Sequence, residues 1–562
     1  LDSYKRHQTF ARLTSGDIVR LDEGARAAFG LAEDLGVDAA DLLDGVSLPA
    51  SSTLFVDSML ERTPALEADR DAAFRRTVER LDTLGKMDFT VPASLKATLR
   101  GYQVDGYQWL GSLEHLGLGG ILADDMGLGK TLQMIAHILA RVETGDTKPT
   151  LVVCPASLVY NWTAELERFA PSLDVCAIVG AKAQRRVQIA GVAEHNVVVT
   201  SYDLMRRDID EYIEQDFARV VLDEAQYIKN PLTQVARAAK RLPAGVRFAL
   251  TGTPIENRLS ELWSIFDFLM PGLLGTRDSF AKRFESPVEH AEGDSAARLQ
   301  ALVSPFVLRR VKEDVVADLP EKIEDTVMAQ LTGEQRKLYL ANQDRIAQQV
   351  QHREAGEFKK DKLKVLAELT KLRQICCDPH LHYADYKAGS AKLDTCMELV
   401  HGALDGGHRI LLFSQFTGML DIIGKRLAKE DIAFLKLTGA SSKESRAKMV
   451  AQFQAGEVPV FLISLKAGGV GLNLTAADVV IHYDPWWNVA AQDQATDRAH
   501  RIGQQHTVTV YKLIAKDTIE ERIMQMQESK RDLVNSVLGG DGISSALFTR
   551  EDVLALLGGD GR

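Results

Sequence analysis

This sequence of 562 residues has few cysteines and no long apolar run. Its five cysteines show neither the spacing of a metal site nor an even set for a disulfide framework. No stretch approaches the roughly 20 apolar residues that span a bilayer. These absences exclude a disulfide-rich secreted domain and a membrane protein, and they suit the reducing cytoplasm. The length predicts two or three separate cores. Because the sequence begins at Leu1 rather than methionine, an upstream segment is left open.

An excess of positive charge is also missing, since the formal net charge is −11. That balance taken alone disfavours a polyanionic partner, but binding responds to the local field rather than to the total charge. Basic residues cluster at Arg206–Arg207 and at Arg309–Arg310 with Lys312. Between residues 353 and 373, seven Lys or Arg face four Asp or Glu, a local net of +3. A solvated helix face explains any one cluster, whereas some members of the set are expected to meet phosphates.

A phosphate-binding loop is the most informative feature that is present. The apolar stretch Gly119–Ala123 leads into Asp124–Thr131, and a helix-like run follows to Arg141. This order of strand, glycine-containing loop and helix is typical of a P-loop. Backbone N–H groups would face the phosphates, Lys130 would reach the β and γ phosphates, and the Thr131 hydroxyl would ligate Mg²⁺. Asp124 stands where the usual pattern has its first glycine.

A pair of carboxylates follows a second apolar strand. Asp223 and Glu224 end the run Arg219–Leu222, and ligands gather at the carboxyl ends of strands in open α/β sheets. Asp223 is predicted to hold the metal and Glu224 to polarise the attacking water. Each could instead be a solvated loop acid or a helix cap, but the two motifs together favour a nucleoside triphosphatase.

Two series of short β-branched runs alternate with amphipathic segments, which predicts two parallel sheets covered on both faces. The expected strands of the first lobe are 151–154, 175–179, 197–200, 220–222 and 248–250. Those of the second are 410–413, 434–437, 460–463, 479–482 and 508–513. The fold class is α/β, with two lobes, helical insertions and a helical N-terminal extension. The expected domains are a mostly helical accessory region (1–95), an ATP-binding lobe (96–275), helical insertions and a linker (276–390), a second lobe (391–515), and a brace helix at Thr518–Leu538 with a tail (516–562), mobile from Gly539.

The span from about Leu99 to Gln527 resembles the Swi/Snf-type helicase-like ATPases of helicase superfamily two, as a bacterial-type member. The resemblance rests on blocks seldom found together, which are Leu99–Gln103, Asp124–Thr131, Pro155–Leu158 with Asn161–Trp162, Asp223–Gln226, Leu250–Pro254 with Asn257, Phe306–Arg310, Phe413–Phe416, Ala467–Leu474, Asp484–Asn488 and Gln494–Gln504. Asp125, Gln226, Val489 and Gln492 depart from the usual residues, but none of these changes removes a group that touches phosphate or metal.

The resemblance implies two RecA-like lobes, ATP and Mg²⁺ as cofactors, and a set of nucleotide-site residues. These are Gln103 at the adenine edge, then Asp125, Met126, Gly127, Leu128, Gly129, Lys130 and Thr131 around the phosphates, with Gly471 in the second lobe. Arg498 and Arg501 are expected to act as arginine fingers on the γ-phosphate. Being three residues apart, they would share one face if they lay on a helix. The catalytic set is thus Lys130, Asp223, Glu224, Arg498 and Arg501.

By the same resemblance, a further set grips nucleic acid or couples it to hydrolysis. It comprises Ser157, Asn161, Trp162, Thr200, Gln226, Thr251, Ser414, Gln415, Lys466, Gly468 and Gly469. Such contacts position a strand without reading its bases. For Trp162, core packing is the favoured alternative to base stacking.

The leading hypothesis is a DNA-stimulated ATPase that translocates along double-stranded DNA and shifts bound proteins, as a monomeric motor at the nucleoid. A strand-separating DNA or RNA helicase and an RNA-polymerase-associated recycling ATPase are the alternatives. An inactive scaffold for DNA or RNA polymerase is a third, non-enzymatic reading, and the five intact catalytic residues argue against it.

Overall fold

The chain divides into two compact units, which we describe separately by their main segments: lobe 1 is Leu1–Asp125 with Gly129–Val315, and lobe 2 is Val316–Asn535. The computed structural model describes residues 87–252, 259–285, 295–315, 320–351, 355–465, 472–486, 489–501 and 503–525, short stretches within 10–82, and residues 553, 556 and 557.

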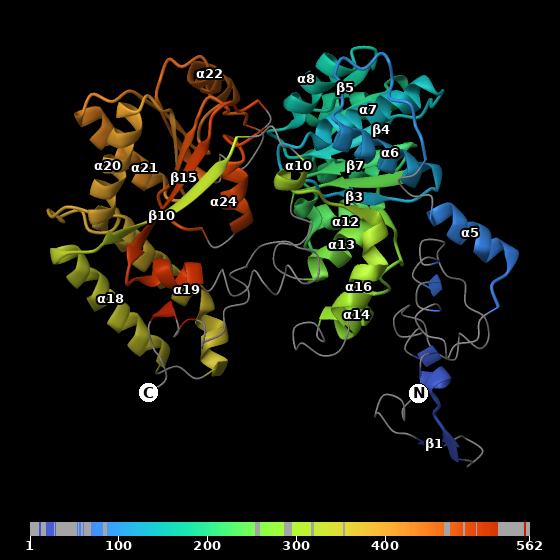
Figure 1. Cartoon of the computed structure of the whole chain (residues 1–562), viewed down its shortest axis with the longest axis horizontal. Helices are drawn as coiled ribbons and strands as arrows, with labels where there is room; N and C mark the ends of the chain where they lie inside the picture. Colours follow the sequence, from blue (N-terminus) through green and yellow to red (C-terminus); the bar gives the residue numbers. More distant parts are fainter. Residues whose placement is uncertain are drawn as a thin grey trace. The chain divides into compact units, whose positions relative to one another are not determined.

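Lobe 1 is built on a parallel sheet of seven strands in the order β5-β6-β4-β7-β8-β3-β9 (Figure 1). The strands are β3 (Gly120–Leu122), β4 (Thr150–Cys154), β5 (Val175–Ala177), β6 (Val197–Ser201), β7 (Arg219–Asp223), β8 (Val246–Leu250) and β9 (Val307–Leu308). The residues of β4 and β6 are all buried, as expected for strands covered on both faces. Each strand expected for the first lobe is present, with ends that differ by one or two residues.

The helices of lobe 1 form two groups around this sheet. In one, α7 contacts both α6 and α8; in the other, α12 contacts both α10 and α13. Their bounds, with those of the other helices up to Val315, are α5 (Ala72–Asp82), α6 (Gly101–His115), α7 (Lys130–Glu143), α8 (Val159–Phe169), α9 (Lys182–Ala190), α10 (Tyr202–Arg207), α11 (Ile209–Tyr212), α12 (Gln234–Arg241), α13 (Leu259–Leu269), α14 (Arg277–Phe280), α16 (Ser295–Val303) and α17 (Lys312–Val315).

Lobe 2 has a parallel sheet of six strands in the order β10-β15-β14-β11-β13-β12. The strands are β10 (Lys322–Gln330), β11 (Ile410–Ser414), β12 (Phe434–Leu437), β13 (Val460–Ser464), β14 (Val479–His482) and β15 (Val508–Lys516). Its helices are α18 (Gly333–Gln351), α19 (Ala355–Cys377), α20 (Ala391–Asp405), α21 (Thr417–Lys429), α22 (Lys443–Gln454) and α24 (Val489–Thr496).

Strand periodicity divides the core of lobe 2 between the two faces of the sheet. Ile410 and Leu412 pack with α20 and α21 in one cluster. Leu411 and Phe413, the alternate residues of β11, belong to a second cluster that includes Phe453 of α22. Successive side chains of a strand point to opposite faces, so one continuous apolar run serves both layers.

The stretch 276–390, expected to be helical, contains two strands. β9 adds to the sheet of lobe 1 and β10 to that of lobe 2, so the predicted insertion region is partly sheet. Both strands escaped the pattern for physical reasons, because β9 has two residues and β10 is a mostly exposed edge strand without an apolar run. The predicted helix across Gly333–Cys376 is confirmed as the pair α18 and α19.

The two ends of the chain also differ from expectation. The region 1–95 contains α5 but also an antiparallel pair, β1 (Phe10–Arg12) and β2 (Ile18–Arg20), whose short strands give no periodic signal. Residues 519–525 are helical, while the rest of the expected brace lies outside the described residues. The tail is not all mobile, because Val553, Leu556 and Leu557 are buried with Ile519 against α18 and α19. Among the described residues, no helix is long and apolar enough to cross a membrane.

Candidate active site and nucleic-acid contacts

The phosphate-binding loop joins β3 to α7 in lobe 1. Gly127 and Gly129 have φ of 88° and 80°, a region that glycine enters without strain. Lys130 Nζ donates to the carbonyl oxygens of Asp124, at 2.6 Å, and Asp125, at 3.3 Å. Burial lowers the pKa of this amine. The loop therefore has the backbone turns and the enclosed cation that a phosphate group needs.

Asp124, the departure from the usual glycine, is held by a distant arginine. Its carboxylate is fully buried and accepts two bonds from Arg310, at 2.8 Å on Oδ1 and 2.5 Å on Oδ2. Gln133 donates to Oδ2 at 3.1 Å, and Arg310 also donates to the carbonyl oxygen of Tyr102. Arg310 thus anchors the start of the loop. The sequence analysis placed Arg310 in a basic cluster expected to meet phosphates and did not predict this pairing. The one signal in the sequence was the acid at position 124, where the usual pattern has glycine.

The carboxylate pair lies at the carboxyl end of β7. Asp223 accepts from Trp162 Nε1 at 2.8 Å on Oδ2, and from the backbone N–H of Glu224 at 3.0 Å on Oδ1. Burial, followed by the neighbouring Glu224 charge, raises the pKa of Asp223 to about 7. Glu224 has φ of 53°, in the left-handed region, which is uncommon for a residue other than glycine and clusters at functional sites.

Gln226 links Glu224 to the end of the next strand. Its Nε2 donates to Glu224 Oε2 at 2.7 Å, and its Oε1 accepts from the Thr251 hydroxyl at 3.0 Å. Thr251 directly follows β8. The amide therefore donates and accepts at the same time, as its chemistry allows, and orients the proposed water-activating carboxylate.

The oxygen atoms that lobe 1 offers as metal ligands suit Mg²⁺. This ion prefers oxygen ligands and usually takes one or two protein groups together with phosphate oxygens. The Thr131 hydroxyl at the start of α7 and the Asp223 carboxylate supply that kind of set. Gln103 lies against the same loop. Its Nε2 is so close to Gly129 that a Cβ added at this glycine would lie only 2.5 Å from it.

The nucleic-acid candidates of lobe 1 fall into two groups. Ser157 and Asn161 are exposed around the start of α8, where a phosphate could meet them. Thr200 and Trp162 are buried, and the Thr200 hydroxyl donates to the carbonyl oxygen of Ile178 at 3.3 Å. Both side chains therefore lie beneath the surface, which for Trp162 is the core packing that the sequence analysis favoured.

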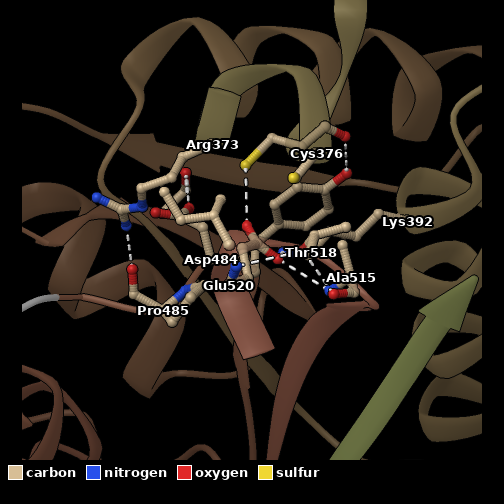
Figure 2. A network of polar contacts seen from close by, with 12 residues as sticks. Arg373, Cys376, Lys392, Asp484, Pro485, Ala515, Thr518 and Glu520 are labelled. Carbon is tan, nitrogen blue, oxygen red and sulfur yellow. Dashed lines mark hydrogen bonds and ion pairs between the residues drawn. The ribbon is translucent and has the colours of Figure 1, made fainter. Parts of the chain in front are cut away.

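In lobe 2, Ser414 ends β11, and the loop that begins at Gln415 is held by an interior polar network, of which Figure 2 shows the part around Arg373, Asp484 and Pro485. The Ser414 hydroxyl donates to Asp484 Oδ1, and the Gln415 backbone N–H donates to the same carboxylate at 3.3 Å. Arg373, from the basic interval on α19, is buried, donates to Gln415 Oε1 at 3.2 Å and to the carbonyl oxygen of Pro485. Arg373 thus supports this loop from inside and does not itself lie at the surface.

The same network continues to a buried ion pair. Lys392 of α20 and Glu520 are both fully buried, with 2.5 Å between Nζ and Oε2 (Figure 2). Burial alone would lower the pKa of Lys392, but the charge and hydrogen bond of Glu520, together with the neighbouring Cys377 and Asp484, raise it. Glu520 also accepts from the backbone N–H of Ala515 at 2.9 Å. The pair ties α20 to the end of β15.

Arg498 and Arg501 lie in turns and not on a helix, because α24 ends at Thr496. The argument from a shared helix face was wrong. The turn is anchored by Gln504, whose Nε2 donates to the carbonyl oxygens of Ala477, at 2.7 Å, and Ala499, at 3.1 Å. Lys466, Gly468, Gly469 and Gly471 lie outside the described residues.

Cysteine clusters give no second site in what the structure describes. Cys376, Cys377 and Cys396 are buried, and burial raises the pKa of each thiol. Within the described ranges, no group of three His, Cys, Asp or Glu residues could hold a metal ion.

Three family models match this chain. The SNF2-related domain covers residues 102–381, the helicase conserved C-terminal domain covers 391–503, and the bacterial SNF2 helicase-associated region covers 1–92. The last match falls on the N-terminal region in which the sequence showed no recognisable motif.

Individual relatives agree with these models. The chain is 40% identical over 461 residues to an ATP-dependent helicase of Mycoplasma pneumoniae, covering 82% of this chain and 44% of that protein. It is 39% identical over 537 residues to the putative helicase/translocase YwqA of Bacillus subtilis, covering 92% and 58%. The chain thus spans about half the length of these curated relatives. A solved SWI2/SNF2 ATPase core of Sulfolobus solfataricus, in complex with dsDNA, is 38% identical, with 83% of this chain and 99% of that one covered and a TM-score of 0.43.

Proposed function

The chain belongs to the SNF2-related helicase-like ATPases, and on that premise we propose that it is a DNA-stimulated ATPase that translocates along duplex DNA. The proposed reaction is hydrolysis of ATP to ADP and phosphate, with Mg²⁺ as cofactor. The work done is movement along the duplex and displacement of bound proteins, without sustained strand separation. Action on chromosomal DNA would place the protein at the nucleoid.

The observation that carries the proposal is the arrangement at the end of β7. Glu224 is oriented by Gln226, Gln226 is held by Thr251, and Asp223 is buried beside them. A protein that only binds DNA has no need for a carboxylate oriented in this way. An enzyme that activates water beside a phosphate does.

Each residue has one role in the proposed mechanism. The loop N–H groups and Lys130 bind the phosphates, and Thr131 and Asp223 hold the metal ion, which neutralises phosphate charge when bound. Glu224 orients the attacking water. Arg498 and Arg501 of lobe 2 stabilise charge on the transferring group, so the function requires both lobes to act on one nucleotide.

The proposed DNA contacts are electrostatic and carry no base information. Exposed Ser157 and Asn161 in lobe 1 present a hydroxyl and an amide that suit phosphate oxygens, whereas in lobe 2 the buried Ser414 hydroxyl and the Gln415 backbone N–H donate to Asp484. A relative's ATPase core has been solved with dsDNA, which supports a duplex as the partner. Stimulation of the ATPase by DNA should therefore depend little on the base sequence of the DNA.

The test compares two displacement assays on one preparation. A translocase should release a third strand from a triplex in an ATP-dependent way while leaving duplex strands paired; strand separation would favour the helicase alternative. Glu224→Gln is the control, since it should bind ATP without cleaving it and release nothing. Release of the third strand by Glu224→Gln at the parental rate would remove Glu224 from its role.

Salt gives an independent check. Phosphate contacts release counterions, so the DNA-stimulated part of the ATPase should fall steeply as salt rises. Basal turnover without DNA should change much less. Equal activity with and without DNA at every salt concentration would contradict the motor function and leave some other ATPase.

A further inference from the structure

Two aromatic residues from separate helices donate hydrogen bonds to Asp223. Trp162 of α8 donates from its indole Nε1 to Oδ2 at 2.8 Å, and Tyr202, the first residue of α10, donates from its hydroxyl to the backbone oxygen at 2.8 Å. Both are almost completely buried, at 1% and 2% exposed. One bond therefore fixes the carboxylate, and the other fixes the backbone that carries it.

Core packing alone does not explain these bonds. An indole N–H is a donor only, and here it ends on a buried carboxylate that the nucleotide site needs. Together with the Glu224 N–H on Oδ1, it places one donor on each carboxylate oxygen and limits rotation of the group. Each oxygen keeps further acceptor capacity, which suits a metal ligand held in one orientation.

Both aromatic residues also adjoin segments near the surface. Trp162 directly follows Asn161, which is exposed. The Tyr202 ring stacks on Tyr227, with ring centres 4.9 Å apart and an interplanar angle of 4°, and Tyr227 is 48% exposed. Asp223 is thus joined to two places at which lobe 1 meets solvent, through its carboxylate by Trp162 and through its backbone oxygen by Tyr202.

We propose that Trp162 and Tyr202 are positioning residues that hold Asp223 in the orientation required for Mg²⁺ binding. This inference rests on the proposed function, since it assumes that Asp223 is the metal ligand. Hydrogen bonds to a ligating carboxylate orient it, and their loss commonly costs about 10- to 100-fold in metal affinity. Removing either donor should weaken Mg²⁺ binding and leave metal-free nucleotide binding intact.

The test uses Trp162→Phe and Tyr202→Phe, which remove the donors and keep aromatic rings. The first measurement is binding of a fluorescent, non-hydrolysable ATP analogue, with Mg²⁺ and with EDTA. Parental protein should bind more tightly with Mg²⁺ than with EDTA; both variants should lose part of that gain, Trp162→Phe more than Tyr202→Phe, and in EDTA both should bind as the parent does. The second is the Mg²⁺ concentration for half-maximal basal ATPase, which should rise about tenfold in Trp162→Phe and less in Tyr202→Phe.

Matched controls separate positioning from packing. Trp263→Phe removes an indole N–H that donates to the carbonyl oxygen of Gly275 at 3.0 Å, and Tyr107→Phe removes a hydroxyl that donates to Thr90 at 2.8 Å. Both control residues are buried in lobe 1. They should lower the melting temperature without changing the Mg²⁺ requirement. A parental Mg²⁺ requirement in both Trp162→Phe and Tyr202→Phe would overturn the inference.

These measurements need no DNA, so this inference and the proposed function can fail separately. If duplex DNA does not stimulate the parent, the motor function is contradicted, while a raised Mg²⁺ requirement in the two variants still supports the positioning role. If DNA stimulates the parent but the variants bind Mg²⁺ normally, only the positioning role is lost.

Discussion

At the first residue of the phosphate-binding loop, Asp124 replaces the usual glycine, and its buried carboxylate needs the opposite charge of Arg310. The two are 186 positions apart in the chain and meet in a buried, two-bonded pair. Removing one partner of such a pair leaves a buried charge without compensation, at a cost of about 3–5 kcal/mol. The acid and the arginine should therefore behave as a single unit.

Arg310→Met should lower the melting temperature of lobe 1 and weaken ATP binding, because the loop that Asp124 begins loses its anchor. Thermal unfolding and equilibrium nucleotide binding measure the two effects. Asp124→Gly in the same protein restores the usual glycine and removes the stranded charge, so the double variant should recover part of both losses. As a control, Arg207→Met alters an exposed side chain and should change stability by less than about 0.5 kcal/mol. A double variant worse than Arg310→Met would refute the pairing.

At the scale of secondary-structure elements, lobe 2 depends on the contact between α20 and the end of β15. The Lys392–Glu520 pair at this contact is fully buried. Its strength differs from that of a surface pair because water cannot screen either charge once its partner is lost.

Lys392→Met should cost about 3–5 kcal/mol of stability, since Glu520 keeps its backbone donor but loses the opposing charge. The double variant Lys392→Met/Glu520→Gln removes both charges and should be more stable than the single one. Lys436→Met is a matched control, since Lys436 and Asp421 also lie 2.5 Å apart but are 41% and 52% exposed; its cost should be at most about 1 kcal/mol. Chemical and thermal unfolding provide the measurement. Equal losses in Lys392→Met and Lys436→Met would mean that burial does not decide the strength of the pair.

At the scale of the whole molecule, the proposed motor needs both lobes for one reaction. Arg501→Ala should lower ATP turnover by roughly 10³-fold or more and remove most of the stimulation by duplex DNA. ATP affinity should change little, because the loop and the metal ligands belong to lobe 1. Steady-state turnover and nucleotide binding, each with and without DNA, measure these effects. Arg426→Ala, which removes a partly exposed arginine paired with Glu430, should leave turnover unchanged. Normal hydrolysis and a normal DNA response in Arg501→Ala would show that another residue completes the site.

Local patterns in the sequence were sufficient for most of the two sheets and for the nucleotide loop. Every strand expected from a β-branched run is present, because an apolar run with turn residues at its ends has few other stable arrangements. The loop between β3 and α7 and the carboxylates at the end of β7 lie where the sequence placed them, because these placements depend on neighbouring residues; their roles stay predictions. The family also followed from short blocks. β9 and the edge strand β10 gave no such local signal.

Only the tertiary structure decided how distant side chains combine. In the folded chain, Arg310 pairs with Asp124 and not with a phosphate. Trp162 and Thr200 lie beneath the surface, and α24 ends before Arg498. Each outcome depends on which element packs against which. A hydrogen bond between residues tens to hundreds of positions apart leaves no periodic trace in the sequence, and the balance between burial and charge that decides it exists only in the folded chain.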